Sequence, residues 1–215
     1  MKLPSLKKPD DANALIITNF QNDFCKNGSL DLKGGEIIGP LLNRLKAHNF
    51  FDVVFLTVDW HPPNHISFNT NHPGKKIHEE ITVPLTSEKI ILWPPHCIKG
   101  EEGSKFYKTL KVEPTDIIIQ KGQCEYSETF SSFGTIHDPT VLKSRLKDLG
   151  IKKIFLCGIA LEYCIYATAK DALKEGFETY IIMDASVPLN PESCKEIEKK
   201  MVEAKINLIV SSGIL

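Results

Sequence analysis

The sequence predicts an α/β fold in which one domain, residues 1–215, holds a mainly parallel sheet flanked by helices on both faces. Short apolar runs rich in β-branched residues recur along the chain, and most lack the alternation of a half-exposed strand. Helical patterns separate several of these runs. No internal repeat, low-complexity tract or linker divides the chain, and 215 residues suit one domain with a buried core.

The predicted strands are the apolar runs themselves. In chain order they are ALIIT (14–18), VVFLTV (53–58), KIILW (89–93), DIIIQ (116–120), KKIFLCG (152–158), ETYIIM (178–183) and INLIV (206–210). Strands of this kind are buried on both faces of a sheet. Helices between them therefore imply right-handed crossovers that join parallel neighbours.

Helix start and stop signals are clearest in the second half of the chain. Asp138-Pro139 predicts the start of a helix that stops at Gly150, and YCIYATAKDALKEG predicts a second helix ending at Gly176. Asn190-Pro191 predicts the start of a third helix. Residues 59–105 are instead rich in Pro, His, Asn and Gly, and a loop region of that length in a compact domain indicates function.

Composition argues against several classes of partner. The formal net charge is -1, and no basic patch for nucleic acid stands out. No apolar run approaches the length of a membrane span, and the start, MKLPSLKKPD, lacks the apolar segment of a secretory signal. The six cysteines are scattered in a chain that needs no disulfides for stability. We expect a soluble, cytoplasmic protein with reduced thiols, no nucleic-acid or membrane partner, and a homo-oligomeric state left open.

Metal-ligating residues cluster after two of the predicted strands. TVDWHPPNHISF places Asp59, His61 and His65 just after a buried strand, and His96 follows KIILW. A carboxylate and imidazoles at the carboxyl ends of parallel strands suit a borderline divalent ion such as Zn²⁺ with open positions for water or substrate. Solvated loop histidines are the alternative. We predict Asp59, His61 and His96 as ligands, and the pattern leaves the role of His65 open.

A nucleophile is predicted in LCGIALEYCIYATAKDA, where a strand ends at Gly158 and a helix follows. This places Cys164 in the first helical turn, where unpaired amides and the helix dipole lower a thiol pKa and form an oxyanion hole. A buried cysteine that packs helix against sheet is the alternative, and Cys157 fits it better. Lys121 and Asn19 follow other predicted strands at the same sheet edge.

Six segments together resemble one family. IITNFQNDF, TVDWHPPNHISF, WPPHC, QKG, ETFSSF and GIALEYC occur in an order similar to that of the nicotinamidase/pyrazinamidase branch of the isochorismatase-like cysteine hydrolases. The resemblance spans nearly the whole chain. It implies the isochorismatase-like hydrolase fold, one divalent metal ion with Zn²⁺ as the first candidate, and hydrolysis of nicotinamide to nicotinate and ammonia in NAD salvage.

The resemblance also implies a role for individual residues. Cys164 corresponds to the nucleophile and Lys121 to its positioning cation, while His65 corresponds to a position at which members differ. A cis peptide precedes Ala160 in the family, and the amides of Ala160 and Cys164 face the oxyanion. The implied metal ligands are Asp59, His61 and His96, with His65 as a further candidate. The implied substrate-binding residues are Phe24, Trp93, Phe130, Ile159 and Tyr163.

Asn19 is the departure from the family pattern. The family has an aspartate there, which takes the thiol proton and later donates it to the departing ammonia. An amide has no useful basicity, and Asp23 matches a second, structural acid of the motif. The chain therefore resembles a nicotinamidase impaired at proton transfer, by a natural or an introduced replacement. The alternatives are an inactive nicotinamide-binding or interaction protein, and a related hydrolase with another substrate such as isochorismate or an N-carbamoyl compound.

Overall fold

A parallel sheet forms the centre of the computed structural model, which describes residues 12–215. The segment MKLPSLKKPD, on which the prediction of no secretory signal rests, lies outside the described residues. The sheet has six strands in the order β5-β2-β1-β6-β7-β8, and every pair is parallel. Its strands are β1 (Ala12–Thr18), β2 (Val53–Asp59), β5 (Ile117–Lys121), β6 (Ile151–Ile159), β7 (Glu178–Val187) and β8 (Asn207–Ile209).

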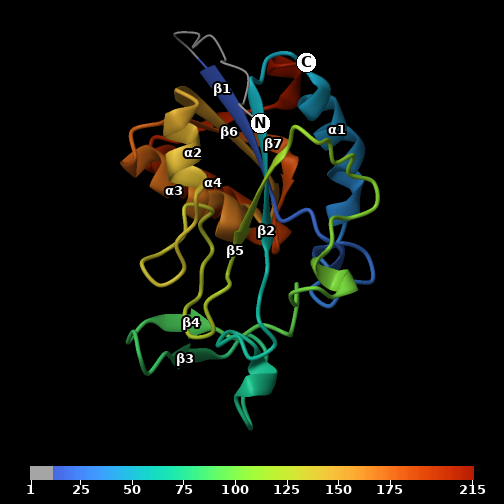
Figure 1. Cartoon of the computed structure of the whole chain (residues 1–215). Coiled ribbons are helices and arrows are strands. Elements are labelled where there is room, and N and C mark those ends of the chain that lie inside the picture. The colour runs from blue at the N-terminus through green and yellow to red at the C-terminus, as the bar shows by residue number, and fades with distance from the viewer. Residues whose placement is uncertain (1–11) are drawn as a thin grey trace.

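Helices cover both faces of this sheet. Figure 1 shows α1 (Gly39–Ala47) on one side and α2 (Leu142–Asp148), α3 (Tyr166–Lys174) and α4 (Cys194–Glu203) on the other. Alternate residues of β1 enter the two cores: Ile16 packs with the face of α2 to α4, and Leu15 with the face of α1. Both side chains are fully buried, which explains the unalternating apolar run. The predicted α/β class is confirmed.

One predicted strand does not belong to the main sheet. β4 (Lys89–Ile91) pairs antiparallel with β3 (Glu80–Thr82) in a separate hairpin, so the prediction that KIILW joins the parallel sheet is wrong. Only Ile90 of β4 is buried, and a run this short carries no period that distinguishes an outlying hairpin from a central strand. His96 is therefore presented by a loop after this hairpin.

The predicted start of the first helix at Asp138-Pro139 is also wrong. Helix α2 begins at Leu142, and the Asp138 side chain does not cap it. Its carboxylate accepts hydrogen bonds from the amides of Gly122 and Gln123 instead. A tertiary contact has thus taken the group that the sequence assigns to a helix N-terminus.

The other helix signals agree with the structure. The Asn190 side chain accepts a 3.0 Å bond from the Glu192 amide and caps a short 3₁₀ helix, Pro191–Ser193, that leads into α4. Gly150 and Gly176 have φ of 69° and 86°, as residues that end helices commonly do.

The remaining general features concern the thiols and the membrane. All six cysteines are free, as expected. Within residues 12–215, none of the helices combines the length and the apolar character that crossing a bilayer requires.

Candidate active site

Polar side chains gather at the carboxyl ends of the central strands. Asp59 and Lys121 end β2 and β5 and are paired in register. Asn19 follows β1, and its backbone N–H donates a 2.8 Å hydrogen bond to the carbonyl of Thr57. β6 ends at Ile159, and a π-helical turn, Leu161–Ile165, then carries Cys164 into α3. The expected convergence of Asn19, Asp59, Lys121 and Cys164 at one sheet edge is therefore what the structure contains.

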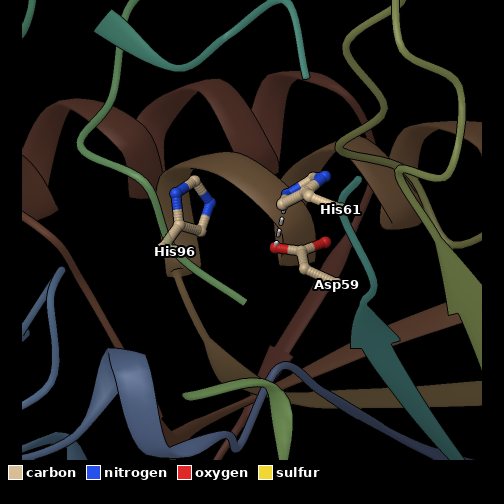
Figure 2. Close-up of side chains that lie close together, drawn as sticks. All are labelled: Asp59, His61 and His96. Atoms are coloured by element: carbon tan, nitrogen blue, oxygen red, sulfur yellow. Dashed lines mark ion pairs between the residues drawn. The ribbon is translucent and has the colours of Figure 1, made fainter. Parts of the chain in front are cut away.

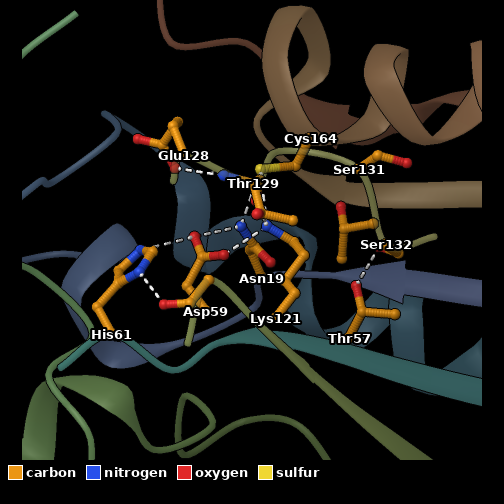
Figure 3. A network of polar contacts seen from close by, with 12 residues as sticks. Asn19, Thr57, Asp59, His61, Lys121, Glu128, Thr129, Ser131, Ser132 and Cys164 are labelled. Carbon is orange, nitrogen blue, oxygen red and sulfur yellow. Dashed lines mark hydrogen bonds and ion pairs between the residues drawn. The ribbon is translucent and has the colours of Figure 1, made fainter. Parts of the chain in front are cut away.

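Lys121 is the centre of a buried polar network (Figure 3). It is fully buried, and its ammonium donates to the Asp59 carboxylate, to the carbonyl of Thr129 at 3.1 Å and to Cys164 Sγ at 3.5 Å. Burial lowers the pKa of Lys121, but the Asp59 carboxylate, with smaller contributions from Cys164 and Glu128, holds that pKa above its usual value. Lys121 is thus a cation whose charge is largely balanced by Asp59.

Asn19 lies between the acid and the thiol. Its side-chain nitrogen donates to Asp59 Oδ2 at 2.8 Å and to Cys164 Sγ at 3.1 Å. The Asp59 carboxylate only accepts, so the –NH₂ end of the amide must face it. Asn19 can therefore donate to a thiolate, but the –NH₂ group that faces the sulfur has no available lone pair with which to take the thiol proton.

The environment of Cys164 overturns one expectation. Burial raises the pKa of the Cys164 thiol to about 12, although Lys121 lowers it. The expectation that the first helical turn lowers this pKa is wrong for the structure, because the thiol is 5% exposed and the Asp59 charge offsets that of Lys121. The thiol is neutral at pH 7 and needs a base.

Asp59, His61 and His96 form a group that fits a metal ion (Figure 2). One potential ligand atom from each lies within 4.8 Å of the others. His61 Nδ1 is 2.7 Å from the carbonyl of Gly122, and His96 Nδ1 is 2.8 Å from that of Pro94. Each Nδ1 therefore carries the proton, which leaves the Nε2 lone pairs for a ligand. Burial lowers the pKa of both imidazoles, so they are neutral at pH 7.

His65 is close to this group but has other partners. Its ring centre is 4.2 Å from that of His61. Its Nδ1 lies 2.8 Å from Ser67 Oγ, and its Nε2 lies 3.2 Å from the carbonyl of Ser127. The structure brings His65 against the side of a candidate ligand and does not include it in the group of three.

A pocket opens beside the Cys164 thiol and the group of Asp59, His61 and His96, which is called the metal group below. The expected substrate-binding residues among its lining are Phe24, Trp93, Phe130 and Tyr163, next to Ala160 and Cys164. The Ile159–Ala160 peptide bond is cis, as the resemblance implies. The Tyr163 ring centre lies 5.2 Å from that of Trp93 and 5.4 Å from that of Phe130. Ile159 is the exception, since its fully buried side chain packs in the core and does not line the pocket.

Four lining residues were missed by the sequence analysis. They are Glu128, Leu30, Leu32 and Leu189. Burial raises the pKa of Glu128, and the Asp59 charge adds to the effect. An acid within the matched segment ETFSSF was the available signal for Glu128. The three leucines come from loops and carried no signal.

The fold and site define an α/β protein with a buried thiol, an ammonium–carboxylate pair and a metal-competent group at one pocket. Residues 13–212 match the model of the isochorismatase domain, and the chain belongs to this family. A nicotinamidase of Acinetobacter baylyi is 35% identical and covered over 94% of each chain.

Solved structures agree with this assignment. An Acinetobacter baumanii nicotinamidase/pyrazinamidase has a TM-score of 0.88 at 36% identity, with 97% of this chain and 100% of that chain covered. A Pyrococcus horikoshii pyrazinamidase in complex with zinc has a TM-score of 0.75 at 31% identity, with 92% and 98% covered. The fold and the nicotinamidase/pyrazinamidase resemblance are thereby confirmed, and the relatives support an amide-hydrolase activity.

Proposed function

We propose that this protein binds nicotinamide at a divalent metal site and is built to hydrolyse it to nicotinate and ammonia, with turnover limited by Asn19. The observation that carries the proposal is a thiol within reach of Lys121 and Asn19 at a pocket that also contains Asp59, His61 and His96. The printed names of the relatives support the substrate class.

The proposed metal ligands are Asp59, His61 and His96, and zinc is the first candidate because one structural neighbour is described in complex with it. When bound, such an ion supplies a Lewis-acid anchor for the pyridine nitrogen. Around it, Phe24, Trp93 and Phe130 would hold the ring by apolar and aromatic contact.

The chain's own groups would carry the chemistry. Cys164 Sγ attacks the carboxamide carbon, and the amides of Ala160 and Cys164 receive the developing oxyanion. The C–N bond then breaks as the leaving nitrogen takes up the proton that the thiol lost and departs as ammonia, and water cleaves the thioester to give nicotinate and the free thiol. The Lys121 ammonium would stabilise the thiolate form of Cys164 before the attack and again when water releases the thioester.

The proton transfers are the weak step. A thiol whose pKa is about 12 must lose its proton before it attacks. Asn19 occupies the place from which a base would take that proton, and its –NH₂ group cannot do so. The same observation favours a second candidate function, in which the protein binds nicotinamide without turnover.

The test of the shared binding site is calorimetry with Zn²⁺ and nicotinamide. We expect about one ion per chain, and nicotinamide binding that requires it. His61→Ala should abolish both, whereas the control His48→Ala, at a half-buried position directly after α1 and outside the pocket lining, should bind as the unmodified protein does. Full metal binding by His61→Ala would refute the ligand assignment.

A further inference from the structure

Asp138 is a buried residue outside the pocket, and its carboxylate is linked by hydrogen bonds to the backbone segment that contacts His61. It is 5% exposed. Its two oxygens accept from consecutive backbone amides, one from Gly122 at 2.5 Å and one from Gln123 at 3.1 Å. These amides belong to the turn that directly follows Lys121. Bonds between an ionised acceptor and backbone N–H groups are stronger than those between neutral groups.

The same turn contacts His61 in two ways. The carbonyl of Gly122 accepts the 2.7 Å bond that fixes the proton on His61 Nδ1. A Cβ atom added at Gly122, whose φ is +70°, would lie 2.4 Å from His61 Cε1. The ring therefore rests directly on this backbone, and a shift of the turn must move the ring or break its bond.

Asp138 is itself fixed by a closed loop. Its amide donates to Thr135 Oγ1 at 3.0 Å, and its carbonyl accepts from the Thr135 amide at 3.0 Å. Gly134 and Pro139 form a β-bridge just outside this pair. The backbone N–H and carbonyl of Asp138 are thus both fixed by Thr135. Because its backbone is fixed, the Asp138 carboxylate can set the position of the turn after Lys121.

We infer that Asp138 is a positioning residue for the metal group. By holding the amides of Gly122 and Gln123, it keeps the Gly122 carbonyl where it selects the Nδ1–H tautomer of His61 and directs Nε2 towards Asp59 and His96. The use of this tautomer for metal binding rests on the proposed function. The tautomer itself does not, since it is a property of the protein without metal.

The test compares Asp138→Asn and Asp138→Ala with a control. In the control, Asp184→Asn, the native carboxylate also accepts two bonds, from the amide of Ser211 at 2.8 Å and its hydroxyl at 2.6 Å. Asp184 is more exposed than Asp138, and its partner Ser211 belongs neither to the pocket lining nor to the group of Asp59, His61 and His96. Zn²⁺ affinity is measured by competition with a chromophoric chelator. We expect affinity to fall about 10- to 100-fold in Asp138→Ala and by less in Asp138→Asn, whose remaining oxygen still accepts one bond. Asp184→Asn should bind as the unmodified protein does.

A second readout is the tautomer of His61 in metal-free protein, from long-range ¹H–¹⁵N correlation spectra. We expect a single Nδ1–H form in the unmodified protein and mixed tautomers when Asp138 is replaced. Lower melting temperatures with unchanged Zn²⁺ affinity and an unchanged tautomer would overturn the inference and leave Asp138 a structural residue. If the unmodified protein binds no Zn²⁺, the proposed function fails, and the tautomer alone decides the inference. If Asp138→Ala does not fold, Asp138→Asn decides both readouts.

Discussion

Removing the ammonium of Lys121 perturbs the site at its most buried charge. The substitution Lys121→Met keeps a long apolar stem but removes the cation that faces the Asp59 carboxylate, which is 4% exposed and would keep the 2.8 Å bond from the Asn19 side-chain amide. Breaking a buried pair by removing one partner costs about 3–5 kcal/mol, because the remaining charge stays desolvated. We expect the free energy of unfolding to fall by about that amount.

The pH range for this measurement follows from the sign of the pKa shift. Asp59 holds the pKa of Lys121 above its usual value, so the pair's contribution to stability is fully present below the unfolded lysine pKa, about 10.4. That contribution is lost only as the pH rises through the still higher folded pKa. Unfolding at pH 7 to 9 therefore reports the full effect.

The assay is urea unfolding in the presence of a chelator, followed by tryptophan fluorescence. A matched control is Lys46→Met, which breaks a second buried lysine–aspartate pair, Lys46–Asp116, whose side chains are 6% and 3% exposed. Both variants should lose stability, but only Lys121→Met should slow alkylation of Cys164. An unfolding midpoint in Lys121→Met equal to that of the unmodified protein would refute the reasoning.

Three further predictions concern the thiol, the metal and the backbone. Because the pKa of Cys164 is about 12, its alkylation rate should rise about tenfold per pH unit from pH 7 to 10. Mass spectrometry follows this rate, and a plateau near pH 8.5 would contradict the argument that burial raises the pKa. Zn²⁺ should accelerate that alkylation, since the Asp59 charge raises the pKa of Cys164 and a bound cation offsets it; equal rates with Zn²⁺ and with chelator would count against this. Gly158→Ala should lower the free energy of unfolding by about 2 kcal/mol or more, because the added Cβ would lie 2.1 Å from the Thr18 carbonyl oxygen and the residue has a φ of +114°. An unchanged thermal midpoint would show that β6 shifts to accommodate the methyl group without this loss of stability.

The central strands were predictable because both their faces are buried. In β1, Leu15 and Ile16 face opposite cores, and the resulting continuous apolar run is the direct trace of that environment. The run KIILW is similarly apolar but pairs with a different partner, the polar strand β3. Pairing between distant segments is decided by tertiary packing, and composition alone did not reveal it.

The site was predictable in its residues and less so in its energetics. Polar groups that follow parallel strands meet at one edge of the sheet, and this rule correctly predicted that four residues lie close together: Asn19, Asp59, Lys121 and Cys164. The raised pKa of Cys164 was not foreseen, because it depends on how deeply the thiol is buried and on the balance of Lys121 by Asp59. Asp138 was assigned to a helix start for a related reason, since its partners lie 15 and 16 residues away.

The most direct test of the central claim is ammonia release from nicotinamide by the Asn19→Asp variant, measured beside the unmodified protein with Zn²⁺ present. The carboxylate would replace an amide nitrogen now 2.8 Å from Asp59 Oδ2 and 3.1 Å from Cys164 Sγ. The negative charge of Asp59 at that distance would raise the pKa of the new carboxyl group at position 19. A raised pKa suits a group that must both take and return a proton. General acid–base catalysis contributes about 10²- to 10⁴-fold, so we predict a gain of that size in turnover, with the dissociation constant for nicotinamide unchanged within about tenfold. A protein that already hydrolyses nicotinamide at ordinary enzymatic rates, or an Asn19→Asp variant that binds Zn²⁺ and nicotinamide but releases no ammonia, would contradict the account.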